Sequence, residues 1–420
     1  MASTPRAAEA QLASGARLKE VMGAHFAAVD RAARERSAPV AWCTSVGPVE
    51  LLRALGYQVF FPENHGALLG ATRMANEVMG RAHALGYSPD ICSYLTSDIG
   101  SYLQGKTPLQ RHGLSGAPRA DLLLYSTNQC REVRDWFEFY GREWNVPVVG
   151  VTSFRDIGEV EPHHVDAIVR QLEALVPTLE SVAGRRLEGP RLEEAVALSR
   201  TSSNLWRSCL RAGAARPAAL TFFDGTIHMG PAVVLRGTQE ACDYYRVLEA
   251  ELQARVRAGT GALPRERFRI YWDGMPVWGR LRDLGALFAR LETSVVASTY
   301  CNSWVFDALD PRDPLRSMAQ ASLELFIARA EGPKHRYLEA MVREFSVDGV
   351  LFHDSRTCPN NSNARFGLPQ RLRRATGTPV LVIDGDLNDL RCFSDEQAHT
   401  NIEGFVEQLE GAAPPAPVSA

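Results

Sequence analysis

The sequence of 420 residues lacks the features that mark several large classes of protein. Its formal net charge is only -3, so there is no electrostatic case for nucleic acid or an anionic membrane as the main partner. No run reaches the roughly 18 apolar residues that a membrane span requires, and the first residues lack the apolar core of a secretion signal. We therefore expect a cytoplasmic protein with no nucleic-acid partner and no membrane segment.

Cysteines are few and widely spaced. No two of them form a CxxC pair, and in a reducing cytoplasm we expect no disulfides. Three of them, Cys209, Cys242 and Cys392, lie on or beside expected helices and are interpreted as small buried apolar side chains. The complete set is Cys43, Cys92, Cys130, Cys209, Cys242, Cys301, Cys358 and Cys392.

Short apolar runs alternate with helical stretches in two parts of the chain, which predicts an α/β fold with parallel sheets flanked by helices. Between these parts the pattern is helical, interrupted by connections containing glycine and proline such as residues 224–231. We predict an N-terminal helical segment at 1–37, a first α/β domain at 38–162, a helical bridge at 163–263, a second α/β domain at 264–412 and a flexible tail at 413–420.

The two α/β regions resemble each other, which indicates a duplication. Asp121 begins an apolar run that leads to Cys130, and Asp348 begins a similar run that leads to Cys358. Two related domains that face each other would bring the ends of their strands into one cleft, where open parallel sheets bind ligands. We therefore expect Cys130 and Cys358 to lie close together.

Cys92, Cys130 and Cys358 differ from the other cysteines. Each lies beside Ser, Thr or Asn near the end of an expected strand, where an apolar side chain is not needed. Thiolates favour iron–sulfur clusters, zinc or Cu(I), and three protein ligands leave the open position that is typical of a catalytic metal. Zinc remains an alternative, although no histidine lies at a zinc-like spacing. The neighbouring Ser93, Thr127 and Asn128 either donate hydrogen bonds to metal-bound sulfur or simply form turns.

Several stretches together resemble the 2-hydroxyacyl-CoA dehydratase and benzoyl-CoA reductase family, over about residues 38–410. They are residues 42–52 (WCTSVGPVELL), 61–67 (FPENHGA), 91–94 (ICSY), 127–130 (TNQC), 352–361 (FHDSRTCPNN) and 384–389 (DGDLND). Within this family the chain is most similar to the B subunit of the ATP-dependent (class I) benzoyl-CoA reductases, through residues 87–100 and 299–306.

The resemblance implies a [4Fe-4S] cluster held by Cys92, Cys130 and Cys358 in the cleft between the two domains. It implies an iron–sulfur subunit of a benzoyl-CoA reductase, which reduces an aromatic acyl-CoA to a cyclic dienoyl-CoA by low-potential one-electron transfers in anaerobic aromatic degradation. The implied partners are a homologous cluster-bearing subunit, ATP-dependent activator subunits and ferredoxin. We expect this chain to have no phosphate-binding loop and to hydrolyse no ATP itself.

A reduction of this kind needs a positioned acid. The candidates are Glu63 and His65, on an expected loop after the strand that ends at Phe61, although both also fit ordinary roles as loop residues. The resemblance points to Ser45 and Glu63 as substrate contacts. Which of these residues donates protons is left open by the sequence.

Three alternatives stay open at this point. The chain is compatible with a 2-hydroxyacyl-CoA dehydratase subunit, which eliminates water by radical chemistry at the same cluster. It is also compatible with a reductase whose larger double-cubane cluster recruits Cys43 or Cys301, and with a noncatalytic subunit that only relays electrons. The acyl group, and whether the substrate binds this chain or its partner, stay open as well.

Overall fold

The computed structural model describes residues 12–411, and its framework is two four-stranded parallel sheets. The strands of the first sheet are ordered β2-β1-β3-β4 and those of the second β6-β5-β7-β8, so in each sheet the second strand in chain order lies outside the first. This shared order confirms the predicted α/β class with two similar domains. The strands are β1 (Val40–Cys43), β2 (Gln58–Phe60), β3 (Leu122–Ser126), β4 (Val148–Val151), β5 (Phe268–Asp273), β6 (Thr293–Ser298), β7 (Gly349–Ser355) and β8 (Val380–Gly385).

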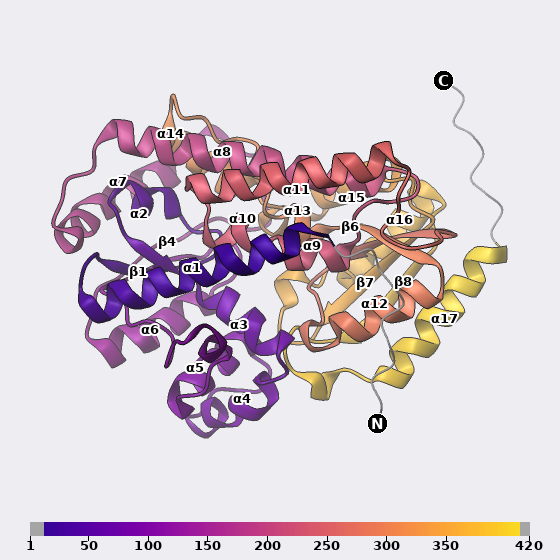
Figure 1. Ribbon diagram of the computed structural model, residues 1–420, viewed down its shortest axis with the longest axis horizontal. Helices are drawn as coiled ribbons and strands as arrows, with labels where there is room; N and C mark the ends of the chain where they lie inside the picture. The colour runs from indigo at the N-terminus through magenta and orange to yellow at the C-terminus, as the bar shows by residue number, and fades with distance from the viewer. Residues whose placement is uncertain (1–11, 412–420) are drawn as a thin grey trace.

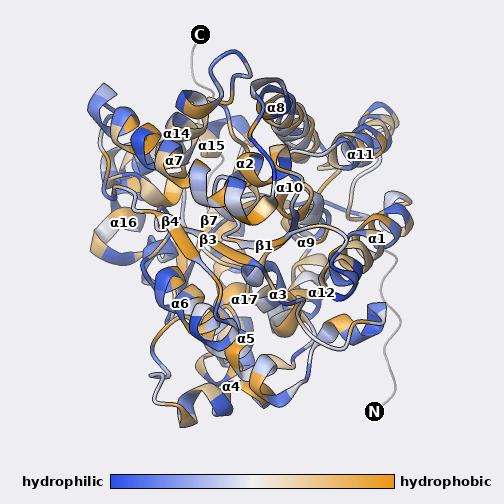
Figure 2. Ribbon diagram, turned by 90° about the vertical axis from the view of Figure 1, so that its left-hand side faces the viewer, coloured by the Kyte–Doolittle hydropathy of each residue, from blue (hydrophilic) through white to orange (hydrophobic). Residues whose placement is uncertain are grey.

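The register of the two sheets repeats as well. Trp42 of β1 pairs with Leu123, and Trp272 of β5 pairs with Leu351. All four side chains are fully buried, as expected for inner strands of parallel sheets that are covered on both faces. The hydrophobic strands β3 and β4 lie amid mixed-polarity helices (Figure 2). The ends of β1 and β5, and the loops that follow β3 and β7, therefore occupy equivalent positions in the two halves.

The first sheet is surrounded by helices from the N-terminal part of the chain. Helix α1 crosses the face of the molecule in Figure 1 and packs against α11 and β2. Its buried side chains recur at the spacing of one helix face. These helices are α1 (Ser14–Glu35), α2 (Val49–Ala54), α3 (Pro62–Ala71), α4 (Ala75–Ala84), α5 (Ser93–Gln104), η1 (Pro108–His112) and α6 (Glu132–Trp144).

Helices fill the middle of the chain. In Figure 1, α8 and α11 run side by side along the top of the molecule and span both halves. The predicted connection at 224–231 is wrong, because this segment is helical: Thr221 and Asp224 cap each other reciprocally, and Pro231 lies in the first turn of the next helix, where proline is tolerated. The helices are α7 (Pro162–Ala183), α8 (Gly189–Arg211), η2 (Ala212–Ala214), α9 (Phe222–His228), α10 (Gly230–Val234) and α11 (Gln239–Arg257).

The second sheet has its own helical layers, and one apolar core continues from it into the first half. Within residues 12–411, no helix combines the length and apolar character needed to cross a membrane. The expected tail at 413–420 lies outside the described residues. The remaining helices are η3 (Trp278–Arg280), α12 (Leu281–Arg290), α13 (Thr299–Asn302), α14 (Pro314–Glu324), η4 (Phe326–Ala328), α15 (Glu331–Glu344), η5 (Pro359–Asn361), η6 (Arg365–Gly367), α16 (Leu368–Thr376), η7 (Leu390–Cys392) and α17 (Asp395–Gly411).

Candidate functional site

The three singled-out cysteines each lie directly before, or one residue away from, the start of a helix. Cys130 lies between β3 and α6, and Cys358 lies between β7 and η5, both at the carboxyl end of a strand as predicted. Cys92 is different, because no strand precedes it and it forms the N-cap of α5. The expectation that Cys92 follows a strand is therefore wrong, although all three cysteines do lie on short, fixed connections.

The fold brings these three thiols together. After burial, the largest influence on the pKa of Cys92 is the charge of Cys358, which raises it, and the charges of Cys92 and Cys358 both raise the pKa of Cys130. Each pair is thus within the range of mutual repulsion, although the sequence separates the residues widely. Two come from the first half of the chain and one from the second, so the meeting point lies between the two sheets.

Backbone N–H groups at the starts of the helices point to the three sulfurs. Burial is the largest effect on these thiols, and it raises the pKa of all three, that of Cys358 to about 12, whereas the N–H donors act in the opposite direction and favour the thiolate. A bound cation that compensates the charge would therefore be required to hold them as thiolates. The donors are Tyr94 and Leu95 for Cys92, Val133 for Cys130 and Asn361 for Cys358.

The spacing of the ligands bears on the kind of metal. Across residues 12–411, no three side chains of His, Cys, Asp or Glu are arranged to hold a metal ion. A cube-shaped cluster binds each thiolate at a different iron, so its ligands lie farther apart than those of one zinc ion. Three converging thiols on helix starts fit a cluster with one open iron better than they fit mononuclear zinc.

Glu63 is linked to one of the cysteine segments through Gln129. It lies in α3, not on a loop as predicted. Its Oε1 accepts hydrogen bonds from the backbone N–H of Ser45 at 3.1 Å and from Nε2 of Gln129 at 2.5 Å, and Gln129 is the residue before Cys130. Its Oε2 is buried and has no partner. Burial raises the pKa of Glu63 to about 7, in the range where a carboxyl exchanges protons at neutral pH.

His65 also lies in α3 and not on the expected loop. It is buried, and both of its ring nitrogens are engaged, Nδ1 with Oδ1 of Asp98 at 2.5 Å and Nε2 with Oγ1 of Thr107 at 2.8 Å. Oδ2 of the same aspartate accepts from Trp136 and Tyr140. These contacts tie α3 to α5 and α6 and leave no ring nitrogen for a substrate, so the geometry favours Glu63 over His65 as the proton donor.

A buried arginine that the sequence did not single out fixes the turn around Ser45. Arg236 donates to the carbonyl of Ser45 at 3.1 Å and to Oε1 of Glu50 at 3.0 Å, and its guanidinium lies over the ring of Phe306. Both charged side chains of this ion pair are only 4% exposed. The sequence feature that could have pointed to a buried Arg236 is its position directly after the apolar residues 233–235.

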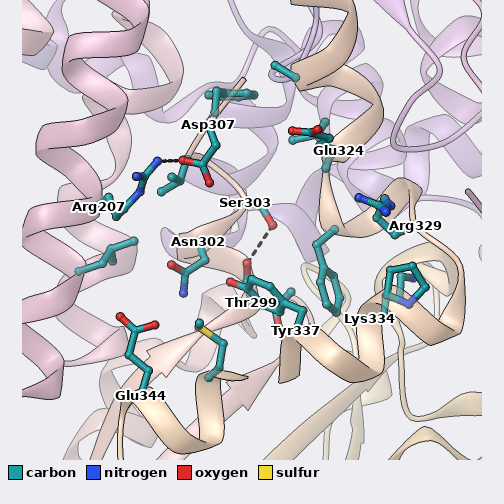
Figure 3. Close-up of a pocket in the computed structure, with 18 of the residues that line it drawn as sticks. Arg207, Thr299, Asn302, Ser303, Asp307, Glu324, Arg329, Lys334, Tyr337 and Glu344 are labelled. Carbon is teal, nitrogen blue, oxygen red and sulfur yellow. Dashed lines mark hydrogen bonds and ion pairs between the residues drawn. The ribbon is translucent and has the colours of Figure 1, made fainter. Parts of the chain in front are cut away.

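A cavity of about 470 Å³ opens between the end of α8 and helices α13, α14 and α15 (Figure 3). Phe306 belongs to its wall, and so does Lys334, whose Nζ donates to Asn363 at 3.0 Å in the segment after Cys358. Through Lys334, the wall of the cavity is thus bonded to the segment that follows Cys358. Four of its lining side chains are cationic: Arg207, Arg211, Arg329 and Lys334.

Cys43 and Cys301 are the cysteines that a larger cluster would recruit. Burial raises the pKa of both. The charges that further affect the pKa of Cys43 are those of arginines and glutamates, and the pKa of Cys301 is lowered by a hydrogen bond with Ser298. None of the three grouped cysteines contributes to either shift. The geometry therefore offers no support for a larger cluster that recruits these residues.

Two side chains expected to donate hydrogen bonds to sulfur donate to other groups instead. The hydroxyl of Ser93 donates to Asp386 at 2.5 Å, and the amide of Asn128 donates to the carbonyl of Val46 at 3.2 Å. Their roles are therefore in the loops themselves, in line with the alternative interpretation of these residues as turn formers.

A phosphate-loop pattern does occur at residues 100–107 (GSYLQGKT), contrary to the expectation that the chain has none. A functional loop of this kind joins a strand to the start of a helix, whereas here the pattern begins inside α5 and runs past its end. Lys106 pairs with Glu77, and Thr107 caps η1 and contacts His65. The tertiary structure thus excludes a phosphate cradle at this pattern.

Comparison with known proteins identifies the family of the chain. Residues 44–409 match the model of the family described as 2-hydroxyglutaryl-CoA dehydratase, D-component. The (R)-2-hydroxyisocaproyl-CoA dehydratase alpha subunit of Clostridioides difficile is 29% identical over 383 residues, covering 90% of this chain and 92% of the relative. The benzoyl-CoA reductase B subunit of Thauera aromatica is 27% identical, covering 83% of each chain. The alpha subunit of the (R)-2-hydroxyglutaryl-CoA dehydratase of Acidaminococcus fermentans is 24% identical, covering 90% of this chain and 94% of the relative. The chain belongs to the 2-hydroxyglutaryl-CoA dehydratase D-component family.

Proposed function

We propose that this chain is an iron–sulfur subunit of an enzyme that adds single electrons to a CoA thioester. The observation that carries the proposal is the convergence of three thiols from both halves of the fold. The residue before one of them is bonded to a buried carboxyl that has one free oxygen. Cys92, Cys130 and Cys358 would hold a [4Fe-4S] cluster, which would supply electrons one at a time at low potential.

Glu63 is the proposed acid and base. With a pKa of about 7 it holds a proton in a substantial fraction of molecules at neutral pH. Its Oε1 is fixed by Ser45 and Gln129, so the unpartnered Oε2 is the atom that would exchange a proton with the substrate. Positioned acids of this kind typically contribute a factor of about 10²–10⁴ to a rate.

The cavity between the end of α8 and helices α13, α14 and α15 is the proposed site for the CoA moiety. Its volume of about 470 Å³ lies in the range of small-molecule sites. Arg207 and Arg211 form ion pairs with Asp307 and Glu344 of the same wall, so Arg329 and Lys334 are the cations that suit the phosphates of CoA. Apolar side chains such as Phe306 and Met341 suit the uncharged arm. Lys334 lies at the end nearest to the cysteine loop.

For the reaction itself we propose dearomatisation of an aromatic acyl-CoA to a cyclic dienoyl-CoA, as in the benzoyl-CoA reductases. The support is the similarity to the B subunit from Thauera aromatica and the motifs at residues 87–100 and 299–306. A homologous cluster-bearing subunit, ATP-dependent activator subunits and ferredoxin would complete the complex, in the cytoplasm.

Dehydration of a 2-hydroxyacyl-CoA is the second candidate. The dehydratase alpha subunits are as similar to this chain as the reductase chain is, at 29% and 24% against 27%. The same Glu63 would then act as the base that removes a proton during the loss of water. A third arrangement, in which the chain only relays electrons, would leave Glu63 without a substrate.

Product analysis separates these reactions. The chain would be co-expressed anaerobically with the subunits encoded beside it, and supplied with ATP, a low-potential reductant and either benzoyl-CoA or a 2-hydroxyacyl-CoA. A cyclic dienoyl-CoA with stoichiometric electron use supports ring reduction, whereas an enoyl-CoA with catalytic electron use supports dehydration. A cluster spectrum that neither thioester changes in the purified chain would refute a substrate site here.

A further inference from the structure

Asp386 is a fully buried carboxyl group at the point where the two halves of the fold meet. It follows β8 directly, and none of its surface is exposed. Its Oδ1 accepts from the hydroxyl of Ser93 at 2.5 Å and from the backbone N–H groups of Asn388 at 3.0 Å and Asp389 at 2.9 Å. Its Oδ2 accepts from Thr357, through the N–H at 2.9 Å and the hydroxyl at 2.6 Å.

The residues that Asp386 joins are the immediate neighbours of two cysteines. Ser93 follows Cys92 in the first half of the chain, and Thr357 precedes Cys358 in the second. These two neighbours also contact each other, since the N–H of Ser93 donates to Oγ1 of Thr357 at 3.1 Å. One carboxyl group therefore links the segments of two thiols that belong to different halves of the fold.

The charge of Asp386 has no direct counterion among residues 12–411, where no Lys, Arg or His side chain forms an ion pair with it. Its three backbone partners can only donate hydrogen bonds, and the ionised carboxylate satisfies all of them. The carboxylate is hydrogen-bonded to the residue after Cys92 and to the residue before Cys358, so its negative charge lies close to both thiols. A field that opposes negative charge on the ligands also opposes the addition of an electron to a cluster bound there.

We propose that Asp386 is a positioning residue that holds Cys92 and Cys358 together across the two halves of the fold and lowers the reduction potential of the cluster that they bind. The inference rests on the cluster of the proposed function, but not on the identity of the acyl group. The proposal gives the segment 384–389 a role in linking the two cysteine segments, in addition to forming the turn after β8.

The test compares Asp386→Asn with Asp384→Asn in the full chain, purified anaerobically with its partner subunits. Asp384 lies only two residues earlier, in β8, but its side chain is exposed, so it controls for the chemistry of the substitution. The measurements are iron and sulfide content and a redox titration of the cluster spectrum. We expect a more positive midpoint potential in Asp386→Asn and an unchanged one in Asp384→Asn. Full iron content with the wild-type potential in Asp386→Asn would overturn the proposal.

A second variant keeps the test decisive if Asp386→Asn does not fold. Thr357→Val removes one hydroxyl from the link while leaving the carboxylate in place. We expect loss of iron to a chelator to become roughly tenfold faster, as is usual for an outer-shell change, at an unchanged potential. Iron retention equal to wild type would contradict the positioning role. A wild-type chain that binds no iron would refute the cluster assignment itself, which is a different outcome from an unaltered Asp386→Asn variant.

Discussion

Replacement of Glu63 by glutamine should affect stability and activity in opposite directions. The glutamine side chain would keep an oxygen that accepts from Ser45 but would carry no charge. In the folded chain, burial raises the pKa of Glu63 from 4.5 to about 7, so the folded state holds a proton that the unfolded state has lost. Wild-type stability therefore falls as the pH rises from about 4.5 through about 7. At about 1.4 kcal/mol per pKa unit, the loss is roughly 3 kcal/mol.

The glutamine variant should escape this loss. We expect its free energy of unfolding to exceed that of wild type increasingly between pH 5 and pH 8, by up to roughly 3 kcal/mol at the upper end. Urea unfolding at several pH values, under anaerobic conditions, measures this difference. Glu173→Gln, at an exposed position of α7, is the matched control and should show none. A pH-independent difference for Glu63→Gln would refute the reasoning that this carboxyl is desolvated.

The same variant should lose most of its activity. We expect turnover to fall roughly 100-fold or more, since the positioned proton donor is missing, with iron content unchanged. Wild-type turnover in a variant that retains its cluster would show that Glu63 does not exchange the proton. The combination of higher stability and lower activity is not expected from a residue with a purely structural role.

Three further predictions concern the surroundings of Glu63. Cys358→Ala should abolish iron binding in an anaerobic iron assay, whereas Cys242→Ala should leave iron content unchanged; equal iron in both variants would refute the ligand assignment. Arg236→Met should lower the free energy of unfolding by about 3–5 kcal/mol, because the buried carboxylate of Glu50 would lose its ion-pair partner. Urea unfolding at pH 7 measures this change, and an unchanged free energy of unfolding would contradict the buried ion pair. His65→Leu should destabilise the fold by about 1–3 kcal/mol, because the hydrogen-bond partners of His65 would be left unpaired. Turnover per folded molecule should stay near wild type. A loss of turnover with unchanged stability would instead show that His65 takes part in the reaction.

Local patterns in the sequence were sufficient for the framework of the fold. The apolar runs that became β1, β3, β5 and β7 are continuous because both faces of a parallel sheet are buried, and that pattern is visible without a structure. The repeated spacing from Asp121 to Cys130 and from Asp348 to Cys358 also anticipated the common strand order of the two sheets. The helix start at Cys92 was not anticipated, because the turn before it resembles a strand-end loop.

The sequence by itself determined which residue types were available to bind a metal, but the tertiary structure decided which of them meet. Residues 100–107 satisfy a phosphate-loop pattern, but the pattern lies at the C-terminal end of α5 and not at the start of a helix, so it cannot form a phosphate-binding loop. Glu63 and His65 are equivalent candidates in the sequence, and only packing separates them, by leaving Oε2 of one free and engaging both nitrogens of the other. The link between Ser93, Thr357 and Asp386 joins residues from distant parts of the chain. Contacts of this kind depend on how the two halves pack together, which local sequence patterns do not encode.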